Sequence, residues 1–240
     1  MMVPTLLGGI STIVATLVVS SGVNMFQSYT LSSSFSPPSS TQTLNKYVKS
    51  DGQVIVPSKI VDEIVDDIKQ MSRRDLLQLW LRCDVPSSLP SIDGDWNGVL
   101  LDNNGPVMST VSTILTDGLF GRGRKWKGKA FHSLARKGIN RFSPRRDGED
   151  VSAQSDTHFE HQFDLSFENS RLDPKSESLT LRYSNYQSRL SLWHSMRDEV
   201  RVLCLDEEGR GILLGLGCMK WSGALWRDGM MNSSPFCLFR

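Results

Sequence analysis

Charged residues recur at every second position late in the chain, where Arg197, Glu199 and Arg201 follow one another. On a β-strand this spacing places the three side chains on one face and Asp198 on the other. If the row points into a barrel, Arg201 and Glu199 could hold the carboxylate or carbonyl group of a ligand. If it points outward, it is a cross-strand charge ladder. The spacing alone leaves both arrangements open.

A basic segment covers residues 122–146, which contain no acidic side chain and include Trp126, Lys129 and Arg141. Basic side chains among aromatic ones suit single-stranded nucleic acid or another anionic ligand. A solvated pair of strands is the simpler interpretation, and the formal net charge of +1 argues against general steering toward nucleic acid. Residues 123–129 fit the G-x-x-x-x-G-K phosphate loop, but Ala130 follows where Ser or Thr would hold magnesium, so no nucleotide is expected.

Catalytic and metal-binding patterns are not found in the sequence. His158 and His161 form H-x-x-H, which on a strand turns the two rings to opposite faces, so they cannot share a metal. There is no G-x-S-x-G motif and no CxxC pair among the four cysteines, which we expect to be small buried residues, with disulfides as the alternative. We therefore expect no catalytic residue, no cofactor and no metal.

Strands must position these residues, because apolar and polar side chains alternate through much of the chain after Trp96. The clearest such run has its apolar and ring-bearing members at positions 159, 161, 163, 165 and 167. Short strands with turn signals every eight to twelve residues are typical of an antiparallel sandwich or barrel. Gly215 and Gly217 share one strand face, which is consistent with sharp curvature or close approach of a ligand. We expect a mainly β fold, with an antiparallel barrel over residues 91–240.

A helical pair is expected before the barrel, within residues 46–90. Ile64, Val65 and Ile68 continue an apolar stripe at helical spacing, with acidic residues opposite. Ser72 and Asp75 have the spacing of a capping box and indicate the start of a second helix. Two short helices bury too little surface to be stable alone, so we expect them to brace the barrel.

The first 45 residues contain no part of the expected barrel. Residues 1–30 are apolar and uncharged, which fits a removed targeting segment, a membrane anchor or a hydrophobic tail that does neither. Residues 31–45 form a Ser- and Pro-rich linker that we expect to be disordered. The serines around Phe35 resemble a plastid-targeting junction. A targeting segment implies an organellar or secretory route, the plastid included; without one the protein is cytoplasmic.

Trp96 lies between two glycines, in Gly94-Asp95-Trp96-Asn97-Gly98, and is expected to open the sheet and plug one end of it. This stretch resembles the G-x-W-x-G signature of the GXWXG/DUF4334 group, whose proteins look like calycins, the lipocalin-type barrels. Further motifs follow in the same order as in that group: Trp126-Lys127-Gly128-Lys129-Ala130-Phe131, Asn140-Arg141-Phe142, Asp198-Glu199-Val200-Arg201, Leu213-Leu214-Gly215 and Pro235-Phe236-Cys237-Leu238-Phe239-Arg240. The resemblance covers residues 76–240 and implies a calycin-like barrel.

The function expected from this reasoning is non-catalytic binding or carriage of a small lipophilic or partly anionic molecule. Trp96 would close one end, Trp126 would wall the cavity, and Arg201 with Glu199 would anchor a polar head; Lys129 and Arg141 are the other candidate contacts. An alternative is an assembly subunit with a filled barrel, held near a membrane by the N-terminus. A further alternative is a barrel lyase or isomerase. A cavity of at least about 300 Å³ favours a ligand, a packed lumen favours the subunit, and an acid/base pair in the lumen favours an enzyme.

Overall fold

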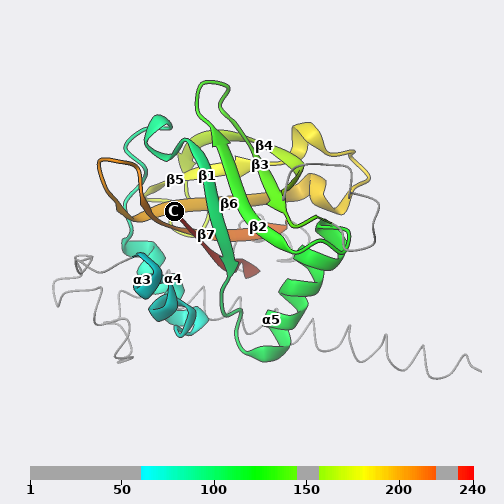
Figure 1. Cartoon of the computed structure of the whole chain (residues 1–240), viewed down its shortest axis with the longest axis horizontal. Coiled ribbons are helices and arrows are strands. Elements are labelled where there is room, and N and C mark those ends of the chain that lie inside the picture. Colours follow the sequence, from blue (N-terminus) through cyan, green and yellow to red (C-terminus); the bar gives the residue numbers. More distant parts are fainter. Residues whose placement is uncertain (1–60, 145–156, 220–231) are drawn as a thin grey trace, which may run out of the picture.

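The computed structural model describes residues 61–144, 157–219 and 232–240 (Figure 1). Within these ranges eight antiparallel strands close into a barrel, each paired with the next and the last with the first. The strands are β1 (Gly94–Leu100), β2 (Trp126–His132), β3 (Lys137–Phe142), β4 (His158–Asn169), β5 (Glu177–Arg182), β6 (Met196–Leu205), β7 (Gly211–Met219) and β8 (Ser234–Phe239). The prediction of an antiparallel barrel is confirmed.

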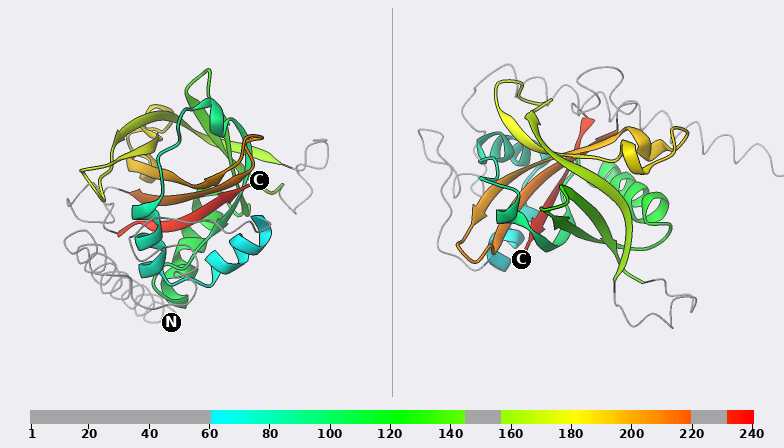
Figure 2. Two further views of the ribbon diagram at one scale, coloured as in Figure 1. Left: turned by 90° about the vertical axis from the view of Figure 1, so that its left-hand side faces the viewer. Right: turned by 90° about the horizontal axis from the view of Figure 1, so that it is seen from above.

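Two helices, α3 (Val61–Lys69) and α4 (Arg73–Arg82), pack on the outside of the barrel against β7 and β8 (Figure 2). The apolar stripe of α3 is buried there, and the Ser72 hydroxyl caps α4 by accepting a hydrogen bond from the Asp75 backbone N–H. The helices therefore lie where the periodicity places them. Of the helices in the described ranges, none has both the length and the apolarity to cross a bilayer. The expected targeting segment, linker and start of the brace, residues 1–60, lie outside the described residues.

Alternating side chains of the strands build two separate cores. In β7, Leu214 and Leu216 face outward and pack with the helices, whereas Leu213 faces the lumen. Large rings fill most of the lumen. All four cysteines are free, and all but the half-buried Cys204 are buried, as expected of small apolar residues.

Trp96 fills one end of the lumen and is fully buried. Its indole N–H donates to the Ile92 carbonyl of the short helix η1 (Pro90–Ile92) at 2.8 Å. The Arg240 guanidinium lies 4.3 Å from the centre of the indole ring. The position expected for this tryptophan, as a plug at one end of the sheet, agrees with the structure.

The alternation in β4 is interrupted at His161, which is an extra residue in the pairing with β3 and has a φ of +58°. Such a bulge reverses the faces on its two sides. Phe163 and Leu165 are buried in the lumen core, but Phe159 is exposed. The prediction that positions 159–167 share one face is therefore wrong for Phe159.

The opposite end of the barrel is covered by a helical segment that the sequence analysis does not anticipate. Helix α5 (Pro106–Thr113) continues directly into the π-helix η2 (Ile114–Phe120) (Figure 1). Hydrogen bonds from Asn103 Nδ2 to Ser112 Oγ (2.8 Å) and Ser234 Oγ (2.9 Å) attach it to β8. We call α5 and η2 together the lid. The remaining short helices, η3 (Ser184–Tyr186) and η4 (Leu192–Ser195), lie between β5 and β6.

Candidate functional site

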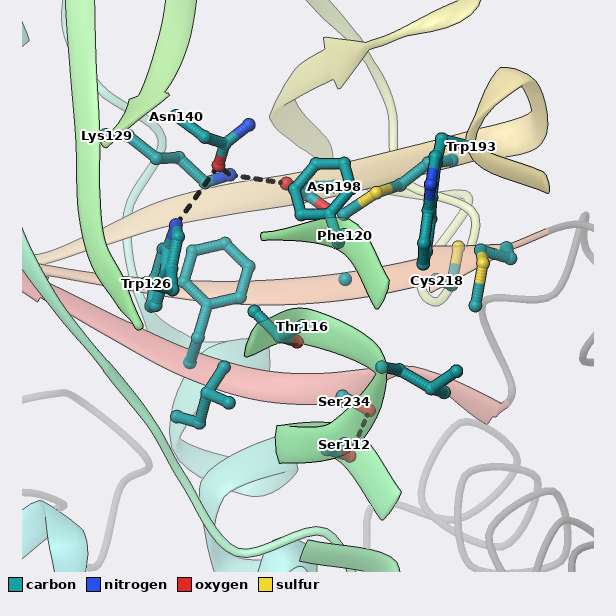
Figure 3. Close-up of a pocket in the computed structure, with 16 residues that line it drawn as sticks. Ser112, Thr116, Phe120, Trp126, Lys129, Asn140, Trp193, Asp198, Cys218 and Ser234 are labelled. Carbon is teal, nitrogen blue, oxygen red and sulfur yellow. Dashed lines mark hydrogen bonds and ion pairs between the residues drawn. The ribbon is translucent and has the colours of Figure 1, made fainter. Parts of the chain in front are cut away.

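Lys129 projects from β2 into the lumen and is buried there with its charge (Figure 3). Its Nζ lies 2.9 Å from Asp198 Oδ2, 2.8 Å from Asn140 Oδ1 and 2.8 Å from the Tyr183 hydroxyl oxygen. An ammonium group has three N–H donors. These three oxygens therefore use all of the hydrogen bonds that Lys129 can donate.

The oxygens around Lys129 are themselves fixed by further hydrogen bonds. The Tyr183 hydroxyl donates to Asp198 Oδ2 at 2.8 Å, and Asn140 Nδ2 donates to the His161 carbonyl at 3.1 Å. The Trp126 indole N–H donates to Asn140 Oδ1 at 3.2 Å. Residues from β2, β3 and β6 and from the end of β5 are thus joined in one buried polar network.

Burial determines the electrostatics of this network. Removal from water lowers the pKa of Lys129, and the ion pair with Asp198 partly offsets this. Burial also raises the pKa of Tyr183 well above its usual value, and the neighbouring Asp198 carboxylate raises it further. Tyr183 is therefore a neutral hydrogen-bond donor, and the ion pair is shielded from solvent.

One oxygen of the network has no hydrogen-bond donor in the part of the chain that the structure describes. Among the described residues, none donates a hydrogen bond to the buried Asp198 Oδ1. This oxygen faces Gly217 of β7, where a Cβ atom would lie only 3.0 Å from it. A buried carboxylate oxygen without a donor is energetically costly, so Asp198 Oδ1 is the atom at which an outside donor would be stabilised most.

Asp198, Lys129 and Asn140 line a cavity of about 90 Å³ between the polar network and the lid. Leu115, Thr116 and Phe120 of η2 form its cover, and Trp126, Trp193 and Phe236 form much of its apolar wall (Figure 3). The cavity is therefore mostly apolar, with its few polar groups gathered on one side.

His161 holds the end of the lid in place. Its ring stacks on Phe120 with centroids 4.0 Å apart, and its Nε2 lies 2.7 Å from the Phe120 carbonyl oxygen. Because a carbonyl only accepts, Nε2 carries the proton. Burial lowers the pKa of His161, which favours this neutral ring. The bulge in β4 is thus the feature that turns His161 toward the lid.

Three of the six predicted contact residues face the lumen. Trp126 and Lys129 line the cavity, as the wall position proposed for Trp126 requires, whereas Trp96 lies at the far end of the barrel. Arg141 lies on the outside, where it donates to the Trp96 carbonyl at 3.2 Å and pairs with Asp95 at 3.5 Å. Arg141 therefore supports β1 and does not reach the cavity.

The charged row on β6 points out of the barrel, so the inward alternative is wrong for Glu199 and Arg201. Arg201 is buried beneath α4, with its guanidinium 4.2 Å from the centre of the Trp80 ring and donating to the Leu81 carbonyl at 3.1 Å. Glu199 is buried beside Arg197, 3.1 Å away. The physical reason is that Asp198 and Val200, on the alternate face, occupy the lumen. Arg201 attaches the helical brace to the barrel, Glu199 pairs with Arg197 outside the lumen, and neither can anchor a ligand in the barrel.

Sequence reasoning missed Asp198, Tyr183 and Asn140 as site residues. The sequence does contain a signal for Asp198, because this residue lies on the strand face opposite the charged row. Choosing that face as the inner one would have identified Asp198 as a lumen residue. Phe120 belongs to the lid, which the sequence analysis does not anticipate. Its role depends on the lid helix and could not be read from strand alternation.

Comparison with known proteins identifies no family for this chain. No family model and no curated protein match the sequence. Among solved structures, the crystal structure of a protein from Thermomonospora curvata is similar, with a TM-score of 0.46 and 16% sequence identity over 75% of this chain and 94% of that chain. The function is therefore argued from the site alone.

Proposed function

We propose that the barrel binds a small, mostly apolar, uncharged molecule that donates a hydrogen bond to Asp198. The observation that supports this most strongly is the Asp198 Oδ1 atom, which is buried, belongs to a residue that lines the cavity, and receives no hydrogen bond from the described residues. A hydroxyl or N–H group placed there would satisfy the carboxylate while the rest of the ligand contacts Phe120, Trp126 and Trp193.

The size of the cavity limits the ligand. Pockets for typical ligands enclose about 300–1,000 Å³, and an engineered cavity of about 150 Å³ holds benzene. A cavity of about 90 Å³ fits a molecule no larger than about benzene, with minor adjustment of the lid. The volume does not support carriage of a long lipid chain inside the barrel.

The charge of the site argues for a neutral ligand. Lys129 and Asp198 neutralise one another, and every Lys129 donor is already directed at a protein oxygen. An anionic head group would approach the Asp198 carboxylate without a free cation to balance it. The proposal therefore replaces the partly anionic ligand expected from the sequence with a hydrogen-bond donor.

Three probes of similar size test this proposal by ligand-observed NMR on the full chain. Phenol presents a donor, toluene replaces the hydroxyl with a methyl group, and benzoate presents an anion. We expect phenol to bind about tenfold more tightly than toluene, as one hydrogen bond of about 1.4 kcal/mol predicts, and benzoate not to bind. Gly217→Val, which fills the cavity beside Asp198, is expected to abolish phenol binding. Equal affinity for phenol and toluene, or phenol binding retained in Gly217→Val, would contradict the proposal.

A second candidate function is an interaction or assembly subunit with a filled barrel. The small cavity and the aromatic packing of the lumen favour it. This candidate predicts that none of the three probes binds and that Gly217→Val costs no function of the intact assembly.

Acid and base groups do lie together in the lumen, which is the condition set above for a lyase or isomerase. However, Lys129 donates to the Tyr183 hydroxyl and to Asp198, and the Tyr183 hydroxyl donates to Asp198, so neither proton is directed at the cavity. The geometry therefore supports binding better than proton transfer.

A further inference from the structure

The outer side of the lid exposes large apolar side chains to solvent. Val107, Ile114 and Leu119 are 55%, 57% and 54% exposed. Val107 and Ile114 lie two helical turns apart on the same side of the helix. Figure 1 shows α5 at the edge of the molecule, beside the barrel.

This outer side also lacks charge, which is unusual for a helix facing water. The only charged residue between Pro106 and Phe120 is Asp117, and its Oδ1 accepts a hydrogen bond from the Trp126 backbone N–H at 2.9 Å. The hydroxyls of Thr110 and Thr113 donate to carbonyls of the preceding helical turn, at 2.8 and 3.0 Å. Even the threonines therefore have their hydroxyls directed to the helix itself.

Basic residues follow immediately after this apolar surface, at positions 122, 124, 125 and 127, with no acidic residue among them. Lys125 is exposed, and the Arg122 side chain is 68% exposed while pairing with Glu160 at 3.1 Å. An uncharged helix side bordered by basic side chains complements an anionic lipid surface, with apolar groups below the headgroups and cations among the phosphates.

We propose that the outer side of the lid docks on an anionic phospholipid bilayer. Val107, Ile114 and Leu119 enter the boundary between headgroups and acyl chains, and the basic cluster contacts the headgroups. The inner side of the same helix carries Leu115 and Phe120 over the cavity, so docking places the cavity cover at the membrane.

Site-directed spin labels on the full chain test the docking directly. One label is placed at Ile114→Cys on the lid, and the control label at Leu134→Cys, which is 101% exposed in the turn between β2 and β3. Collision of each label with oxygen is compared in buffer, with phosphatidylcholine vesicles and with vesicles containing phosphatidylglycerol. The chain with its native cysteines alone, treated in parallel, gives the background.

We expect the Ile114→Cys label to become oxygen-accessible with phosphatidylglycerol vesicles only, and the Leu134→Cys label to stay aqueous throughout. In the chain labelled at Ile114→Cys, Lys125→Glu should weaken vesicle binding about fivefold or more. Lys175 is an exposed lysine in the β4–β5 loop, and Lys175→Glu should leave vesicle binding unchanged. An Ile114→Cys label that stays aqueous overturns the proposal. So does one that is already immobilised in buffer, because this would show that protein covers the lid. The result of this test does not depend on whether a ligand occupies the cavity.

Discussion

Replacing Lys129 by Met tests whether water is excluded from the polar network in the lumen, as the burial of the network indicates. Methionine keeps the length of the side chain and its apolar stem but removes the charge. The Asp198 carboxylate then stays fully buried with the Tyr183 hydroxyl as its one remaining donor among the described residues. Neither Asn140 nor the cavity supplies a replacement cation.

The magnitude follows from the buried charge that is left behind. Removing one partner of a buried ion pair typically costs about 3–5 kcal/mol of the free energy of unfolding. Asp198→Asn should cost less, about 1–3 kcal/mol, because burial already lowers the pKa of Lys129 and the amine can release its proton. In the double variant no unpaired charge remains. We therefore expect its loss of free energy of unfolding to be smaller than the sum of the two single losses by about 2 kcal/mol or more.

The assay is urea unfolding of the full chain and its three variants at neutral pH, followed by circular dichroism and tryptophan fluorescence together. Coincident transitions by the two probes are required before the free energies are compared. A Lys129→Met loss below about 1 kcal/mol would mean that water reaches Asp198. Additive single losses, within about 0.5 kcal/mol, would mean that the two residues are not coupled. Either result would refute the buried network.

Three further predictions concern stability. Trp96→Ala should cost about 3–5 kcal/mol through loss of a fully buried ring, measured by thermal and urea unfolding, and an unchanged melting temperature would contradict its role as a plug. Arg201→Met should lower the free energy of unfolding by about 2–4 kcal/mol by removing buried hydrogen bonds, yet leave phenol binding unchanged; lost binding in a folded variant would return Arg201 to the ligand site. Glu168, whose pKa is lowered to about 2 chiefly by its hydrogen bond from Arg182, stabilises the fold above pH 4.5, and this is lost as the pH falls through about 2. The stability difference between the native chain and Glu168→Gln should therefore be largest at neutral pH, about 1–2 kcal/mol, and shrink in acid; a constant difference would contradict this assignment.

The sequence was informative where side-chain spacing alone determines structure. The stripe around Ile64 and the cap at Ser72 locate the outer helices, and the alternation in β4 locates a strand of the barrel. Trp96 was placed correctly because a large aromatic between glycines must be buried at a point of close approach.

Other features depend on contacts that spacing does not encode. The lid was not anticipated, because Thr110, Thr113 and Ile114 are β-branched and the segment has no charged face to mark a helix. The left-handed conformation of His161 is maintained by its stacking on Phe120, which lies far away in sequence. For the same reason the inward face of β6 could not be chosen until the position of α4 over Arg201 was known.

The most direct test of the proposed function is a high-resolution crystal structure of the full chain with phenol. The proposed function predicts phenol under the lid, its ring against Phe120 and Trp126, and its oxygen about 2.6–3.0 Å from Asp198 Oδ1. Phenol bound only elsewhere, or lying in the cavity with its oxygen turned away from Asp198, would contradict it.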